Sequence, residues 1–183
     1  SISENFQMRN TNTTIEESLL LLSRLVERAV GVDQELVVYL SMGFGNPYGD
    51  PWSPALVADW VKRLVDIGVN RISLSDTVGL AQADTIRELF EYLNMVHPDV
   101  FFGAHLHAKP NEVILKIKAA YAGGCRAFDS AIRGLGGCPM AKDSLTGNVP
   151  TEKLLSFLTA QKSKFSVNML HFEAAYNTSL QIC

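Results

Sequence analysis

The sequence lacks several features that would place it in common classes of protein. It has only three cysteines, Cys125, Cys138 and Cys183, an odd and sparse set that fits a reducing compartment better than a disulfide scaffold. No apolar run reaches the roughly 20 residues that a membrane helix needs, and no basic segment followed by an apolar stretch marks a signal peptide. We therefore expect a protein with no membrane partner, and the cytoplasm as its compartment.

The chain also has no large excess of either positive or negative charge. The net charge is −3 and the isoelectric point about 5.8, so nothing favours nucleic acid or an anionic surface as a partner. No Gly-x-Gly-x-x-Gly opens a helix, no phosphate-loop motif is present and there is no Ser–His–Asp signature. What the chain does have is 47% hydrophobic residues and a mean hydropathy of +0.09, which indicate one globular domain.

Hydrophobic periodicity predicts alternating strands and helices. Continuous apolar runs of the kind found in parallel sheets begin at residues 36, 71, 100 and 127. Their spacing of about 26 to 35 residues is the length of a strand–helix unit. The expected strands are 36–40, 71–74, 100–105 and 127–132, and the expected helices are 15–30, 54–67, 82–96, 110–122, 151–161 and 168–181.

The chemically interesting residues follow the carboxyl ends of these strands, where parallel α/β folds bind ligands. Four strands cannot close an eight-stranded barrel, which usually needs about 250 residues. The chain is therefore either an open α/β sheet or the C-terminal part of a (β/α)8 barrel whose first strands are absent from the sequence. The opening residues, which read as an entry into the middle of a fold, agree with the second alternative.

Two histidines near the end of the third expected strand form the strongest candidate site. Alternation of side chains along a strand places His105 and His107 on one face, which is a chelating geometry for a divalent cation. With oxygen donors, two imidazoles suit Mg²⁺, Mn²⁺ or Zn²⁺, and the lack of a second nearby cysteine disfavours a structural zinc cluster. The alternative is a pair of histidines hydrogen-bonded in a polar loop. His97 and His171 have no such partner and are interpreted as structural or exposed.

Cys138 is a candidate acid or base. It lies in the glycine-rich turn that includes Gly136 and Gly137, where a thiol is approachable and a nearby metal charge would lower its pKa from about 8.5. Such a thiol can donate or accept a proton. The alternative is a turn residue without chemistry. Cys125 enters a strand and is expected to fill the core.

Two aspartates at strand ends allow two interpretations each. Asp76 either holds substrate or caps a turn. Asp129 lies in an apolar strand, so its carboxylate needs a partner, for which Arg71 and Arg126 are the candidates.

At these residues the sequence resembles the hydroxymethylglutaryl-CoA lyase family, a group of metal-dependent TIM-barrel lyases. The resemblance covers nearly the whole chain. The matching motifs are Asn-Pro-Tyr-Gly at 46–49, Ile-Ser-Leu-Ser-Asp-Thr-Val-Gly at 72–79, His-Leu-His at 105–107, Gly-Leu-Gly-Gly-Cys-Pro at 134–139 and Gly-Asn-Val-Pro-Thr-Glu at 147–152. The cysteine of the fourth motif separates lyases of this group from the related synthases.

The resemblance implies a division of roles among these residues. His105, His107 and Asn148 would bind Mg²⁺ or Mn²⁺, with Zn²⁺ less suited, and His105 would also lie close to the substrate's hydroxyl. Cys138 would be the catalytic thiol and Asp76 a carboxylate that positions an acyl-CoA substrate, which Asn46, Gly136 and Gly137 would also contact. The family's remaining metal ligand, an aspartate beside a catalytic arginine, would lie upstream of residue 1. The implied assembly is a homo-oligomer, most simply a dimer.

The implied reaction is cleavage of hydroxymethylglutaryl-CoA to acetyl-CoA and acetoacetate. The sequence departs from the family pattern after His107, where Ala108-Lys109-Pro110 replaces an Asp-Thr-Tyr segment. Two alternatives therefore accompany the lyase assignment: a Claisen-condensing synthase of the same superfamily, and a non-catalytic paralogue that binds metal.

Overall fold

Helices and strands alternate along the chain in the computed structural model, which describes residues 1–137 and 146–182. The elements, in order, are α1 (Glu4–Thr11), α2 (Ile15–Gly31), β1 (Val38–Ser41), α3 (Pro54–Asp66), β2 (Arg71–Asp76), α4 (Ala83–Val96), β3 (Phe101–Ala108), α5 (Val113–Ala122), β4 (Ala127–Phe128), the 3₁₀ turn η1 (Ile132–Gly134), β5 (Gly147–Asn148), α6 (Thr151–Ala160) and α7 (Met169–Ser179).

Local sequence signals fix where the helices begin. The Thr14 hydroxyl accepts a hydrogen bond from the backbone N–H of Glu17, and the Glu17 carboxylate accepts one from the N–H of Thr14, so α2 starts at a capping box. The Ser53 side chain caps α3, with Pro54 in its first turn. These two helix starts were predicted from the sequence.

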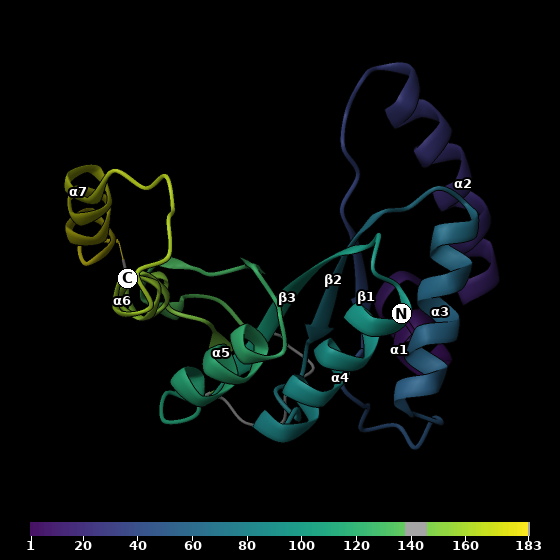
Figure 1. Ribbon diagram of the computed structural model, residues 1–183, viewed down its shortest axis with the longest axis horizontal. Coiled ribbons are helices and arrows are strands. Elements are labelled where there is room, and N and C mark those ends of the chain that lie inside the picture. Colours follow the sequence, from purple (N-terminus) through teal and green to yellow (C-terminus); the bar gives the residue numbers. More distant parts are fainter. Residues whose placement is uncertain (138–145, 183) are drawn as a thin grey trace.

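The four main strands form a parallel sheet in the order β1–β2–β3–β4, so each strand lies beside the next one in the chain. Figure 1 shows α3, α4 and α5 along one face of this sheet, with α2 beside α3 at one end and α6 and α7 at the other. A sequential parallel order with the helices on one face is the topology of a (β/α) barrel, whereas a doubly wound sheet reverses its order and carries helices on both faces.

The core lies between the sheet and the helices. From β2 and β3 the buried residues Ile72, Leu74, Phe102 and Leu106 point toward the helix layer. On the opposite face, large apolar side chains remain exposed: Tyr39 is 48% exposed and Phe101 43%. In a closed barrel that face lines the interior, so these exposed side chains agree with a sheet that is a part of a barrel.

Three elements differ most from the sequence prediction, and β3 also extends beyond the predicted 100–105, to Ala108. The fourth strand is much shorter than the predicted 127–132, because the backbone turns away from β3 after the hydrogen bond from the Asp129 N–H to the Ala104 carbonyl. Among the described residues the segment that follows forms an isolated bridge, from Ala131 to Pro150. Helix α1 was not predicted, because its residues are strongly polar and form no apolar stripe. Strand β5 has two residues and is defined by its antiparallel pairing with β3, which local sequence does not encode.

Among the residues that the structure describes, none of the helices combines the length and apolar character that a membrane span requires.

Candidate active site

The site is built around the two histidines of β3, which project from the same face of the sheet. The Nε2 atoms of His105 and His107 are 3.2 Å apart, and the ring centroids are 5.1 Å apart. His107 is 4% exposed, and its buried Nδ1 atom has no hydrogen-bond partner within residues 1–137 and 146–182. The predicted placement of both rings on one face is therefore confirmed, and their Nε2 atoms face each other.

His105 has a carboxylate partner, Asp129, for which an arginine partner was expected from the sequence. Its Nδ1 atom lies 3.1 Å from Oδ2 of Asp129, just beyond the end of β4. The expectation that Arg71 or Arg126 pairs with Asp129 was wrong: Arg71 forms an ion pair with Glu35, and Arg126 donates to backbone carbonyls. Parallel pairing of Ala104 with Phe128 brings the next residues of both strands, His105 and Asp129, side by side.

Tyr39 of β1 completes this cluster. Its hydroxyl interacts electrostatically with the nearby Asp129 carboxylate, and its ring packs edge-on against His105 at a centroid distance of 5.6 Å and an angle of 82°. The sequence offered one signal for it, an aromatic residue within an expected strand whose carboxyl end carries polar residues. Strand order was needed to bring it to His105.

These contacts shift three pKa values. The hydrogen bond from His105 lowers the pKa of the Asp129 carboxyl, with a further contribution from Tyr39, against an opposing effect of burial. Burial, followed by the neighbouring His105, lowers the pKa of His107 and so favours its neutral ring. Burial, followed by the neighbouring Asp129 carboxylate, raises the pKa of Tyr39. A neutral imidazole is the form that binds a metal ion.

Asn148 is directly opposite His107 across the antiparallel pair of β3 and β5. Side chains of directly opposed residues lie on the same face of a sheet, so the amide projects beside the imidazoles. Its Nδ2 atom donates to the carbonyl of Leu135 at 2.9 Å, which leaves the Oδ1 atom as the available donor to a cation.

The glycines before Cys138 pack closely against this amide. A Cβ atom on Gly136, whose φ is +82°, would come within 3.1 Å of the Asn148 Nδ2 atom, and one on Gly137 would come within 3.0 Å of the Thr146 carbonyl. Glycine is required here for close approach and for the left-handed backbone. The predicted catalytic Cys138 itself lies outside the described residues, and the substrate contacts of Gly136 and Gly137 stay predictions.

Asp76 lies on the other face of the sheet. It pairs in register with Leu106, and its carboxylate faces the helix layer, where Oδ2 is 2.8 Å from the Lys116 ammonium of α5. The same carboxylate accepts hydrogen bonds from the backbone N–H groups of Leu80 and Ala81. These contacts favour the turn-capping interpretation of Asp76, while its predicted contact with substrate stays a prediction. Lys116 carried no sequence signal.

Asn46 is engaged within its own loop. Its Oδ1 atom accepts from the backbone N–H groups of Tyr48 and Asp50, and its Nδ2 atom donates to the Asp50 carbonyl. The side chain therefore shapes the turn after β1, and its role in binding substrate stays a prediction.

The donor set fits a divalent cation. Ligand atoms about 2.0–2.1 Å from one ion, at tetrahedral or right angles, lie about 3 Å apart, which matches the 3.2 Å separation of the two Nε2 atoms. No cluster of three or more His, Cys, Asp or Glu side chains suited to a metal is found within residues 1–137 and 146–182. This part of the protein thus offers two imidazoles and one amide oxygen, and leaves coordination positions open.

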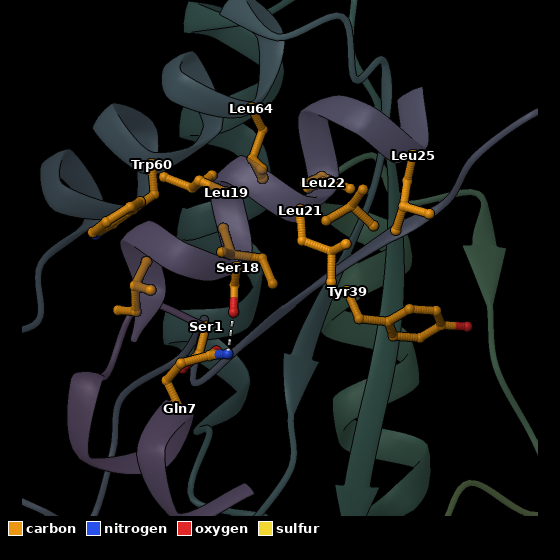
Figure 2. Close-up of a pocket in the computed structure, with 13 residues that line it drawn as sticks. Ser1, Gln7, Ser18, Leu19, Leu21, Leu22, Leu25, Tyr39, Trp60 and Leu64 are labelled. Atoms are coloured by element: carbon orange, nitrogen blue, oxygen red, sulfur yellow. Dashed lines mark hydrogen bonds between the residues drawn. The ribbon is translucent and has the colours of Figure 1, made fainter. Parts of the chain in front are cut away.

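Two hollows flank the sheet. One, of about 150 Å³, lies on the uncovered face and is lined by residues that include Tyr39, Phe101 and Asp129. The other, of about 240 Å³, is an apolar groove beside β1, which we call the β1 groove; it is lined by Ser1, Gln7, Ile15, Ser18, Leu19, Leu21, Leu22, Leu25, Val38, Tyr39, Leu40, Trp60 and Leu64. Figure 2 shows the leucines of α2 gathered along it, and the Tyr39 hydroxyl pointing away from them.

The sequential parallel sheet with its helices on one face defines an α/β protein of the (β/α) barrel type. The chain belongs to the HMGL-like family, whose model matches residues 1–178. Lyases of this family depend in general on a divalent metal ion. The α/β barrel class predicted from the sequence is thereby confirmed.

Curated relatives carry the same family resemblance. The hydroxymethylglutaryl-CoA lyase of Pseudomonas mevalonii is 35% identical over 85% of this chain and 52% of its own length. Two mouse relatives named for different compartments, a cytoplasmic 3-hydroxy-3-methylglutaryl-CoA lyase (32% identical; 91% of this chain, 48% of the relative) and a mitochondrial hydroxymethylglutaryl-CoA lyase (31%; 92% and 52%), are similarly close. The chain therefore spans about half the length of the curated relatives it matches.

Solved structures agree. The HMG-CoA lyase of Bacillus subtilis superposes with a TM-score of 0.89 at 27% identity, over 98% of this chain and 60% of that one. An HMG-CoA lyase from Acinetobacter baumannii, determined in complex with coenzyme A and 3-methylmalate, gives a TM-score of 0.79 at 26% identity, over 91% and 54%.

Proposed function

We propose that the protein containing this chain cleaves the carbon–carbon bond of a 3-hydroxyacyl-CoA, converting hydroxymethylglutaryl-CoA to acetyl-CoA and acetoacetate. The observation that carries the proposal is the convergence of the His105 and His107 Nε2 atoms, 3.2 Å apart, beside Asn148 at the carboxyl end of the sheet. Relatives named hydroxymethylglutaryl-CoA lyase, and a structural neighbour in complex with coenzyme A, support this substrate class over a synthase reaction.

In the proposed site His105, His107 and the Oδ1 atom of Asn148 hold Mg²⁺ or Mn²⁺. Such a cation polarises substrate oxygens and stabilises negative charge that develops on them. His105 lies at the end of β3 and is placed to contact the substrate's 3-hydroxyl. The glycines at 136 and 137 would let the backbone approach the substrate closely, as Gly136 approaches the Asn148 amide and Gly137 the Thr146 carbonyl.

The proposed reaction is a retro-Claisen cleavage. A base removes the proton of the 3-hydroxyl, the bond between C2 and C3 breaks, and its electron pair leaves as the enolate of acetyl-CoA while the former C3–OH becomes the ketone of acetoacetate. The thiol of Cys138 then donates its proton to the enolate carbon. General acid–base assistance of this kind contributes about 10² to 10⁴-fold.

The proposal is tested by assaying the full-length protein with hydroxymethylglutaryl-CoA and either Mg²⁺ or Mn²⁺. We expect acetyl-CoA release, and a rate about 10² to 10⁴-fold lower for Cys138→Ala. Cys125→Ala is the matched control, because it removes a thiol that is buried in the core. Absence of turnover in the unaltered protein rejects the lyase function, and full turnover by Cys138→Ala rejects the role of its thiol.

We further propose that residues 1–183 form the C-terminal part of a single HMGL-like barrel domain, and that preceding strands of that barrel occupy the β1 groove. The support is the apolar character of the groove, the position of β1 at the end of the described strand order, and coverage of about half of the relatives' length. The predictions of a dimer, of the cytoplasm and of no nucleic-acid or membrane partner stay untested.

A further inference from the structure

The two ring nitrogens of His105 face chemically different neighbours. Nδ1 lies 3.1 Å from a carboxylate oxygen of Asp129, and Nε2 lies 3.2 Å from Nε2 of His107. A neutral imidazole carries one proton, and an ionised carboxylate can only accept a hydrogen bond. The proton of a neutral His105 therefore belongs on Nδ1, and the lone pair on Nε2 points toward His107.

Asp129 is itself held from two directions. Its backbone N–H donates to the carbonyl of Ala104 at 3.0 Å, which fixes its main chain beside β3. Its carboxylate interacts electrostatically with the nearby hydroxyl of Tyr39, which comes from β1. The Tyr39 ring also packs edge-on against the His105 ring and limits its rotation. Residues from three strands thus fix the tautomer and the plane of one imidazole.

We propose that Asp129, supported by Tyr39, is a positioning residue that holds His105 with its Nε2 lone pair directed at the cation shared with His107. The inference rests on the proposed function only in assigning a cation to that point. Hydrogen bonds that metal-binding histidines donate to carboxylates commonly orient the ring and raise its basicity, and their loss typically weakens metal affinity about 10–100-fold.

The first test is calorimetric titration of the metal-free, full-length protein with Mn²⁺. We expect Asp129→Ala to weaken Mn²⁺ binding about 10–100-fold. Asp129→Asn keeps the size of the side chain and a neutral acceptor, and is expected to weaken it less. Tyr39→Phe, which removes the hydroxyl beside the Asp129 carboxylate, is expected to weaken it about 2–10-fold. Asp59→Ala is the matched control, because Asp59 lies on the exposed side of α3, and it should bind Mn²⁺ as the unaltered protein does.

The second test reads the tautomer without metal, from the ring ¹⁵N chemical shifts of His105 at pH 8. The unaltered protein should carry the proton on Nδ1, and Asp129→Ala should shift the population toward protonated Nε2. A failure to bind Mn²⁺ combined with this tautomer pattern rejects the metal site of the proposed function and leaves the positioning role intact. Protonated Nε2 in the unaltered protein, or unchanged Mn²⁺ affinity in a folded Asp129→Ala variant, overturns the positioning role.

Discussion

The two faces of the sheet each carry an aspartate paired with a basic side chain, and the two pairs differ in burial. The Asp76 and Lys116 side chains under the helices are 2% and 4% exposed, and both oxygens of the carboxylate are hydrogen-bonded. The Asp129 and His105 side chains on the opposite face are 41% and 28% exposed. The Nε2 atom of this histidine faces the Nε2 atom of His107, 3.2 Å away. The buried pair of Asp76 and Lys116, whose polar atoms are hydrogen-bonded, therefore stabilises the fold. The partly exposed pair of Asp129 and His105 leaves the lone pair of the His105 Nε2 atom accessible for chemistry.

The buried pair also links the two faces. The Lys116 ammonium donates to the carbonyl of His107 at 2.9 Å and to that of Gly79 at 3.1 Å, in addition to Asp76. It therefore joins the ends of β2 and β3 immediately behind the imidazoles. Damage to this pair is expected to lower stability first and metal binding only as a consequence.

The largest expected effect is the loss of stability in Lys116→Met. Removing the cation leaves the buried Asp76 carboxylate without its partner, which typically costs about 3–5 kcal/mol in the free energy of unfolding. The measurement is urea denaturation at pH 7. The double variant Lys116→Met with Asp76→Asn is the control and should recover part of the loss. A single variant as stable as the unaltered protein would show that the pair does not hold the fold.

The next prediction concerns pH and His107 in the metal-free protein. Burial holds the pKa of this ring below its ordinary value of 6.5, so the unfolded chain binds its proton more tightly than the folded one. The stability contribution is therefore present above about pH 6.5 and declines as the pH falls below that value. Urea midpoints at pH 7.5 and 5.5 should show a smaller decline for His107→Asn than for the control His171→Asn, which alters an exposed histidine. Equal declines in both variants would contradict the prediction.

A smaller effect on stability is expected at the partly exposed pair. Asp129→Asn should change the free energy of unfolding by less than about 1 kcal/mol, because the contact is partly exposed and the asparagine oxygen can still accept the hydrogen bond. Urea denaturation beside the Lys116→Met measurement gives the comparison directly. A loss at Asp129 as large as that at Lys116 would remove the distinction between the two faces.

The smallest expected effect is on the reactivity of Cys125, where we predict none. Burial raises the pKa of this thiol to about 12, and the side chain is fully buried under the helices. Its thiolate is therefore negligible at pH 8, and iodoacetamide should not modify it in the native protein. Peptide mass spectrometry with and without denaturant provides the measurement. Modification under native conditions would show that the helix-covered face opens readily.

Local sequence signals predicted much of the fold. In the candidate active site they predicted the two histidines but not the side chains that contact them. The capping box at Thr14, the apolar runs of the strands and the alternation that places His105 and His107 on one face are all encoded within a few residues. Asp129 beside His105, Tyr39 beside both, and Lys116 beneath His107 depend on which strands and helices become neighbours. That information lies in pairing between segments 9 to 90 residues apart, which one sequence does not display.

The most direct test of the account is anomalous diffraction at the manganese edge from crystals of the full-length protein grown with Mn²⁺. The account predicts one strong peak at bonding distance from the Nε2 atoms of His105 and His107 and the Oδ1 atom of Asn148. No peak there, or a peak bound through other atoms, would contradict it.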